Sequence, residues 1–253
     1  MAVTGVKVKP LIAGNWKMNG GRKGMTQLKS LVQRLTQVQV RADIMICPPS
    51  LDISAASEIT KGSKVTIGGQ DCHANPDGPH TGDISAAMLK QFGVKAVIVG
   101  HSERRRDYTE TDKGIKAKAE AAVEAGLSPI VCIGETLQER KAGKTLRVVG
   151  AQLRGSLPDT DMPDKVVVAY EPVWAIGTGL TPTPDQVAQV HLHIRKALIR
   201  RYGAGGAAIR ILYGGSVNPG NAAELLGIEH VNGALVGGAS LKSADFIKII
   251  TAA

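Results

Sequence analysis

The chain alternates between short runs of apolar, often β-branched residues and longer segments in which apolar positions recur at helical spacing. A run that is apolar at every position is typical of a parallel strand covered by helices on both faces. Such runs predict eight strands, at Leu11–Ala13, Ile44–Cys47, Val65–Ile67, Ala96–Val99, Pro129–Ile133, Val166–Val168, Ile209–Leu212 and Gly233–Val236. The segments between them predict helices, several opened by a Ser, Thr or Asp N-cap, over Met25–Thr36, Thr111–Ala125, Pro184–Tyr202 and Ser243–Ile250.

Eight strand and helix units in 253 residues predict an α/β fold, a closed (β/α)₈ barrel formed by a single domain over residues 1–253. A doubly wound open sheet is the structural alternative, because it has the same alternation of elements. No Ser-rich or low-complexity linker interrupts the chain. In either architecture, functional residues gather at the C-terminal ends of the strands, so a site is expected there.

Four of the predicted strands end in polar or glycine-rich segments. The first is followed by Asn15 and Lys17, and the fourth by His101. The seventh and eighth are followed by Gly214-Gly215-Ser216 and Gly237-Gly238, where bare backbone lets N–H groups approach an anion. If short helices follow Ser216 and Gly238, their N-termini add partial positive charge. These ends predict a phosphate-binding site at the rim that also holds the polar side chains.

The segment after the sixth strand combines a carboxylate with a loop. Glu171 lies at the rigid end of the strand, Pro172 restricts the backbone after it, and Gly177 and Gly179 leave it free further on. This pattern is typical of a lid with two hinges, here Val173 to Thr178. A single Glu at a strand end is most often a surface group. Its convergence with a lysine and a histidine at the same rim favours instead a base beneath a closing lid.

The charge balance is basic, with 31 Lys and Arg against 22 Asp and Glu and a net charge of +9. Only 3% of the residues are aromatic, so the positive charge suits small anions better than nucleic acid. The three cysteines are widely spaced, which is expected of a reduced, cytoplasmic protein, and no pair has zinc spacing. No apolar stretch approaches membrane-spanning length. We therefore expect a soluble cytoplasmic protein that binds neither membrane nor nucleic acid.

Three further motifs partly match cofactor-binding or metal-binding patterns, but none of them fits such a pattern fully. Gly143-Lys144-Thr145 is not a P-loop, because Gln138 stands where the first glycine would be. Gly203–Ala208 has the glycine spacing of a dinucleotide turn, but it follows a helix and precedes a strand, so a loop is predicted. His191 and His193 are two positions apart within a helical segment and therefore face apart. We expect neither metal nor organic cofactor.

Five motifs together resemble the triosephosphate isomerase family. They occur in family order across essentially the whole chain, at Asn15-Trp16-Lys17, His101-Ser102-Glu103-Arg104-Arg105, Tyr170 to Gly179, Tyr213-Gly214-Gly215-Ser216-Val217 and Leu235-Val236-Gly237-Gly238-Ala239. The resemblance implies a homodimeric barrel enzyme, an aldose-ketose isomerase. Such an enzyme interconverts dihydroxyacetone phosphate and D-glyceraldehyde 3-phosphate through an enediolate, with no cofactor.

The resemblance also implies a role for each residue. Glu171 is expected to act as the base, His101 as a neutral electrophile and Lys17 as an electrostatic stabiliser. A neutral histidine and a closing loop are known features of this family. Substrate binding is expected from Asn15, Lys17, Gly177, Ser216, Gly237 and Gly238. Glu103 is the expected partner of Lys17.

One segment departs from the family pattern. His80 stands where the family usually has a bulky aromatic residue, in a loop that by resemblance inserts into the partner subunit. The expected homodimer therefore requires that this loop pack against the partner subunit with His80 in place of the aromatic residue.

Two other classes of protein remain as alternatives. A barrel aldolase would use Lys17 as a Schiff base and would be trapped by borohydride. A basic, non-enzymatic scaffold would bind nucleic acid with steep salt dependence.

Overall fold

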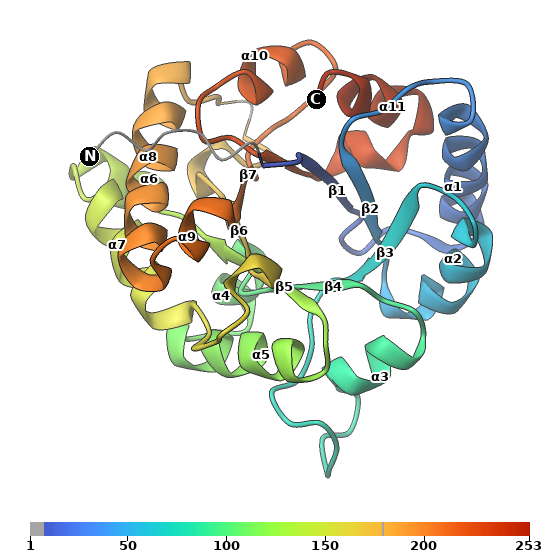
Figure 1. Cartoon of the computed structure of the whole chain (residues 1–253), viewed down its shortest axis with the longest axis horizontal. Coiled ribbons are helices and arrows are strands. Elements are labelled where there is room, and N and C mark those ends of the chain that lie inside the picture. The colour runs from blue at the N-terminus through green and yellow to red at the C-terminus, as the bar shows by residue number, and fades with distance from the viewer. Residues whose placement is uncertain (1–7, 179) are drawn as a thin grey trace.

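The computed structural model describes residues 8–178 and 180–253. Eight parallel strands close into a barrel in sequence order (Figure 1). The last strand, β8, pairs with β1. The strands are β1 Leu11–Asn15, β2 Asp43–Cys47, β3 Val65–Gly69, β4 Ala96–Val99, β5 Ser128–Ile133, β6 Val167–Tyr170, β7 Arg210–Tyr213 and β8 Gly233–Val236. The predicted (β/α)₈ barrel is confirmed, and the open sheet is excluded because the first and last strands are hydrogen-bonded to each other.

Helices surround the barrel on its outer face (Figure 1). They are α1 Gly21–Leu35, α2 Ile53–Thr60, α3 Ala86–Gln91, α4 Ser102–Asp107, α5 Asp112–Glu124, α6 Leu137–Lys141, α7 Thr145–Ser156, α8 Pro184–Tyr202, α9 Gly205–Ala208, α10 Ala222–Leu226 and α11 Ser243–Thr251. Short 3₁₀ turns lie at Ser50–Asp52, Pro163–Lys165, Val173–Ala175 and Gly238–Leu241. The four helices predicted from periodicity correspond to α1, α5, α8 and α11.

Alternate strand residues face two separate cores. Ile12 packs outward, between the sheet and the helices, whereas its neighbours Leu11 and Ala13 face the interior of the barrel. The interior set continues with Met45, Cys47, Ala96, Ile98, Ile130, Cys132, Val167, Ala169, Leu212 and Leu235. Because these side chains fill the barrel, it is a packed core and not a pore. A ligand can therefore bind only at its ends or on its outer surface.

The predicted loop at Gly203–Ala208 is wrong for its last four residues, which form α9. Gly206 packs so closely on α8 that a Cβ there would lie 2.2 Å from the carbonyl oxygen of Leu198. Arg195 of α8 also donates a hydrogen bond of 2.7 Å to the Gly206 carbonyl. These contacts come from tertiary packing, which explains why glycine spacing alone did not predict a helical turn.

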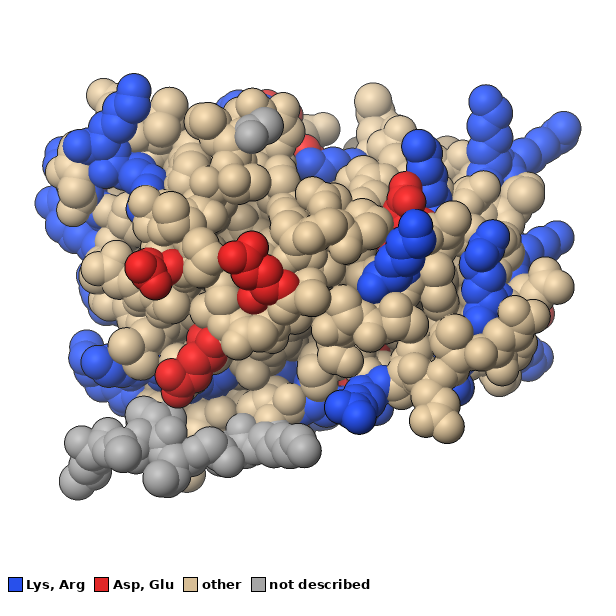
Figure 2. Space-filling model, turned by 90° about the horizontal axis from the view of Figure 1, so that it is seen from above, with Lys and Arg blue, Asp and Glu red and all other residues tan. Residues whose placement is uncertain are grey.

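Lysine and arginine side chains stand out over the face seen in Figure 2, with few acidic side chains between them. This matches the basic composition. Cys47, Cys72 and Cys132 are buried and unpaired, as expected without a disulfide framework. Within residues 8–178 and 180–253, no helix combines the length and the apolarity needed to cross a bilayer.

Candidate active site at the C-terminal rim of the barrel

A cavity of about 340 Å³ opens at the C-terminal ends of the strands. Its lining includes every residue that the sequence assigned to the site, namely Asn15, Lys17, His101, Glu171, Gly177, Ser216, Gly237 and Gly238. These residues follow five different strands, so only barrel closure brings them together. Gly179, the expected second hinge of the lid, lies outside the described residues.

Glu171 is the most deeply buried ionisable group of this cavity, with 1% of its surface exposed. It directly follows β6, and its N–H donates to the carbonyl oxygen of Ile133 at 2.7 Å, which extends the pairing with β5. One carboxylate oxygen lies 2.9 Å from His101 Nε2, and the other accepts a hydrogen bond of 2.9 Å from the Ser102 N–H. Burial by itself raises the pKa of Glu171, but His101, the Ser102 amide and Lys17 together hold the pKa below its usual value.

His101 is the N-cap of α4. Its Nδ1 accepts a hydrogen bond of 3.2 Å from the Glu103 N–H, so this nitrogen carries no proton and Nε2–H points at Glu171. Only a neutral ring can accept that bond. Burial lowers the pKa of His101, but the carboxylates of Glu171 and Glu103 outweigh burial and raise it. The hydrogen bond from the Glu103 amide thus favours the expected neutral form of His101. The carboxylate of Glu171 favours the protonated form for as long as the two side chains remain paired.

Lys17 is fixed in the cavity by contacts at both its backbone and its amine. Its Nζ lies 2.6 Å from Glu103 Oε1, which confirms the expected pairing. Its backbone has a φ of 53°, a strained value for a non-glycine residue. Asn15 Oδ1 accepts from the Lys17 N–H at 3.0 Å, and Gln70 donates to the Lys17 carbonyl at 2.8 Å. These bonds hold the strained turn, so the ammonium group is positioned before any ligand arrives.

In the glycine-rich part of the cavity, few atoms of other residues cover the backbone. A Cβ at Gly238 would meet no atom within 4 Å, and one at Gly237 would meet only Lys17 Cε, at 3.6 Å. A 3₁₀ turn does begin at Gly238, as the sequence reasoning supposed. No helix directly follows Ser216, because α10 begins only at Ala222. Ser216 instead donates through Oγ to the carbonyl oxygen of Ala175 at 2.7 Å, which ties this segment to the lid.

Glu135 is a site-supporting residue that the sequence analysis missed. It is completely buried and accepts hydrogen bonds from the Tyr170 hydroxyl and from Trp174 Nε1, the latter at 2.9 Å. Trp174 lies in the 3₁₀ turn that begins the lid, where Thr178 Oγ1 in turn donates to the Trp174 carbonyl. Glu135 therefore anchors the first half of the segment that is expected to act as a lid. Its position just beyond β5 was the available signal, since the same reasoning selected Glu171 beyond β6.

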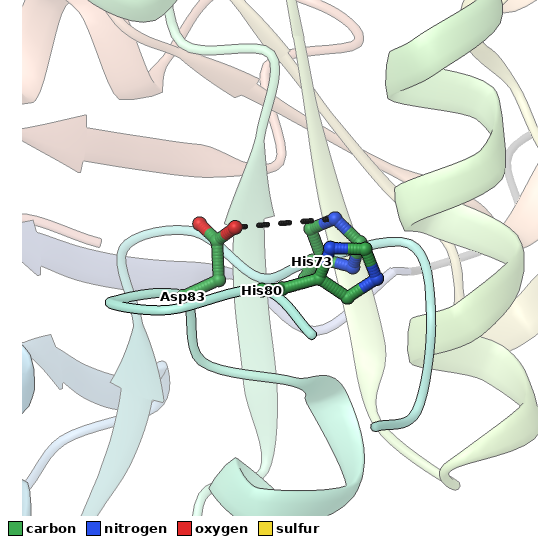
Figure 3. A group of neighbouring side chains, drawn as sticks. All are labelled: His73, His80 and Asp83. Carbon is green, nitrogen blue, oxygen red and sulfur yellow. Dashed lines mark ion pairs between the residues drawn. The ribbon is translucent and has the colours of Figure 1, made fainter. Parts of the chain in front are cut away.

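His80 belongs to a cluster with His73 and Asp83 in the loop between β3 and α3 (Figure 3). His73 Nε2 lies 3.9 Å from Asp83 Oδ2, and the two imidazole rings are stacked with centroids 3.9 Å apart. Ring lone pairs lie in the ring plane, so stacked rings do not direct them at one ion. His73 Nδ1 also already accepts a hydrogen bond from the Asn75 N–H. We interpret the cluster as a loop-stabilising contact in which His80 stacks as an aromatic residue would.

A barrel that gathers ionisable side chains and uncovered glycine backbone at the C-terminal ends of its strands belongs to the class of (β/α)₈ enzymes. The family model described as triosephosphate isomerase matches residues 10–253. The chain belongs to the triosephosphate isomerase family, whose members are isomerases.

Individual relatives agree with this assignment over nearly their full lengths. The chain is 55% identical to the triosephosphate isomerase of Bradyrhizobium sp. (strain ORS 278), covering 96% of this chain and 97% of that protein. It is 56% identical to the one of Ruegeria sp. (strain TM1040), covering 96% and 98%. The crystal structure of triosephosphate isomerase from Bartonella henselae superposes with a TM-score of 0.90 at 47% identity, covering 97% of this chain and 99% of the other.

Proposed function

We propose that this protein interconverts dihydroxyacetone phosphate and D-glyceraldehyde 3-phosphate through an enediolate, without metal or organic cofactor. The observation that carries the proposal is the pairing of a buried carboxylate with an imidazole at 2.9 Å inside a cavity that a lysine and uncovered glycines also line. Moving a carbonyl to the adjacent carbon requires a base that removes a carbon-bound proton and returns it next door. It also requires positive charge and donors for the enediolate oxygens.

Glu171 is the base in this proposal. Paired with His101 and the Ser102 amide, it is a weak base, because these contacts lower its pKa. When it turns from them toward a substrate carbon, it loses the stabilising donors and keeps its burial, so its proton affinity rises. Substrate binding thereby activates the carboxylate at the moment when its basicity is needed.

His101 is the electrophile. The same movement of Glu171 removes the carboxylate that raises the pKa of His101, while the Glu103 amide still occupies Nδ1. The ring is then neutral, and its Nε2–H is free to donate to the substrate carbonyl oxygen. Lys17 stabilises the developing negative charge, and the Asn15 amide donates to the same oxygens.

The phosphate group lies over the glycine-rich part of the cavity. Backbone N–H groups of Gly177, Ser216, Gly237 and Gly238 hold it in this proposal, because each of these residues lines the cavity and the glycines allow close approach. Gly177 has a φ of 70°, which only glycine adopts without strain. The lid therefore closes over the phosphate and excludes water from the enediolate.

We further propose that the chain is a single domain and acts as a cytoplasmic homodimer. Several large apolar side chains are exposed: Leu51 is 96% exposed, Phe92 53% and Met88 47%. Leu51, Met88 and Phe92 line one further cavity, of about 300 Å³. Contiguous apolar surface of this kind favours a protein partner. Sedimentation of the purified protein tests the dimer.

A coupled assay tests the proposed reaction. Dihydroxyacetone phosphate is supplied, and formation of glyceraldehyde 3-phosphate is followed through an added dehydrogenase. We expect turnover in the presence of a chelator, because no metal takes part. Absence of product would refute the function. Trapping of the protein by borohydride with its carbonyl substrate would favour the aldolase, but Lys17 is ion-paired with Glu103, whereas a Schiff-base lysine must be a free neutral amine.

A further inference from the structure

A groove with a strongly basic lining lies between α7 and α8, which run side by side on the outside of the barrel (Figure 1). Its volume is about 220 Å³. The apolar part of its lining comes from Leu153, Leu157 and Ala197, and its basic part from Arg154, His193, Lys196, Arg200 and Arg201. No acidic side chain of the described residues lines it. It lies on the helical layer, away from the cavity at the strand ends.

Most of the cations in this groove are not neutralised. Among the described residues, Arg154, Lys196 and Arg200 form no ion pair. Arg201 alone has a carboxylate partner, Asp159 at 2.7 Å. The groove thus carries a net positive charge of several units at neutral pH. Like charges held this close repel one another, so a bound anion would stabilise the arrangement.

Two buried polar atoms of the same groove also have no partner. Only five buried side-chain nitrogen or oxygen atoms of the described chain lack a hydrogen bond, and His193 Nε2 and Arg201 Nε are two of them. A buried donor or acceptor without a partner is costly to the folded state. Both atoms lie beside the basic groove but are closed to solvent, so an anion in the groove would act on them through its charge and not by direct contact.

Gly150 of α7 brings two of these groups together. A Cβ at this position would lie 3.2 Å from His193 Nε2 and 3.5 Å from Arg154 Nη1, so the imidazole and the guanidinium meet above a bare stretch of helix. Burial lowers the pKa of His193, and Arg200, Arg154 and Lys196 lower it further. The positive charges of Arg154, Lys196 and Arg200 therefore all act on the His193 ring. An anion bound among these three cations would raise the pKa of His193 again.

The dipoles of α7 and α8 explain only part of the clustering of cations in the groove. Arg154 lies in the last turn of α7, and Arg200 and Arg201 in the last turn of α8, where cations stabilise the helix dipole. Lys196 lies within α8, outside that turn. The dipole also explains neither the apolar lining nor the two atoms without partners. A bound anion accounts for the cluster of unpaired cations, which the helix dipoles explain only in part.

We propose that the groove between α7 and α8 is a second anion-binding site, which binds a small phosphate monoester with an apolar organic part. The phosphate contacts Arg154, Lys196 and Arg200. The organic part lies against Ala197, since Leu153 and Leu157 are each only 2% exposed. The small volume of the groove limits the ligand to a small molecule. The proposal does not depend on the isomerase reaction, since no residue of the groove lines the cavity at the strand ends.

Titration of the full-length protein with phenyl phosphate, observed through the imidazole resonances of ¹³C-labelled histidines, tests the proposal. The His193 signal is identified by its loss in His193→Gln. We expect it to shift saturably with phenyl phosphate, and only at higher concentration with inorganic phosphate, which cannot cover the apolar lining. Because His193 reports on the groove alone, binding at the strand ends does not interfere. No shift of the His193 signal would overturn the proposal.

Matched variants separate a site from general charge attraction. We expect Arg154→Gln with Lys196→Gln to weaken binding at His193 by about tenfold or more, because two charge contacts are lost. Lys248→Gln on α11 removes an equally exposed cation outside the groove and should leave the affinity unchanged. Equal weakening in the control would show attraction to net charge only and would refute a built site. All three positions are exposed, so the variants should fold.

Discussion

The two mouths of the barrel contain cavities of similar size but different chemistry. The cavity at the C-terminal ends of the strands measures about 340 Å³, and the one at the N-terminal ends about 380 Å³. Both contain charged side chains. At the N-terminal mouth, Asp43 is 37% exposed and forms ion pairs with Lys9 and Arg210. At the C-terminal mouth, the side chain of Glu171 is only 2% exposed and is paired with His101.

In the proposed function, burial and not the size of a cavity distinguishes the reactive mouth from the other one. Water near Asp43 screens its charge, so its ion pairs contribute little and change little when a ligand arrives. Around Glu171 each donor gained or lost acts in a poorly screened environment, so a small movement changes proton affinity strongly. The C-terminal mouth also has glycine backbone open to an anion. Variants at the two mouths should therefore differ in kind as well as in degree.

The largest effect is expected from Glu171→Gln, which keeps the shape of the side chain and removes its proton affinity. We expect kcat to fall by about 10²–10⁴, equivalent to roughly 3 to 5 kcal/mol of barrier. KM should change much less, because the phosphate contacts remain. Steady-state kinetics in both directions measure this. Turnover close to that of the unaltered protein would exclude Glu171 as the base.

A buried group outside both mouths should affect stability and not activity. His191 of α8 is fully buried, and burial lowers its pKa to about 4. In the unfolded chain it titrates near 6.5, so below that pH the unfolded state binds more protons and the free energy of unfolding falls. The loss due to this group should reach about 3 kcal/mol between pH 6.5 and pH 4.

His191→Phe should remove that loss while leaving activity at neutral pH intact. Urea unfolding at several pH values measures the difference. An identical dependence on pH in the two proteins would contradict the buried, neutral state of His191.

Removing the lid should change the product as well as the rate. An enediolate can expel its neighbouring phosphate, and in the proposed mechanism the lid holds that group where elimination is disfavoured. Deleting residues 176–178 should leave the barrel folded, slow isomerisation by about 10²-fold, and release methylglyoxal and inorganic phosphate. A circular dichroism spectrum checks the fold and a phosphate assay the product. A folded variant that forms only isomer would mean that the lid does not protect the intermediate.

The smallest effect is expected at the opposite mouth. Asp43→Asn should leave kcat and KM unchanged and lower the free energy of unfolding by less than about 1 kcal/mol, as is usual for an exposed ion pair. Activity and urea unfolding measure both quantities. A loss of activity comparable with that of Glu171→Gln would show that the two mouths do not differ as described.

The sequence predicted the barrel because each strand is a run of apolar residues bounded by helical segments. Such a pattern depends only on local hydrophobicity and helical periodicity. It also predicted eight of the residues that line the cavity, because parallel strands bring their C-terminal ends to one rim and the family resemblance selected individual residues there. Glu135 was missed, although it lies two residues beyond the end of β5 and Glu171 lies directly beyond β6. Its function in anchoring Trp174 depends on where a side chain from another unit lies, and the local pattern does not contain that information.

The sequence also did not predict that two opposing contacts act on the protonation state of His101. The start of a helix after His101 predicts a neutral ring, and the contact of the Glu103 amide with Nδ1 agrees. The opposing contact with Glu171 arises only when two strands that are far apart along the chain bring their ends together. Likewise, α9 forms because α8 packs against it. In each case the missing information is a tertiary contact.

Isomerisation in D₂O tests the central claim, proton transfer by a buried carboxylate, most directly. A carboxylate that takes a proton from one carbon and returns it to the next can exchange that proton with solvent while the enediolate lives. We therefore expect glyceraldehyde 3-phosphate formed from dihydroxyacetone phosphate to carry deuterium at carbon 2 in a measurable fraction of molecules, as detected by proton NMR. Complete retention of the original hydrogen would indicate its direct transfer between carbons and would contradict the account.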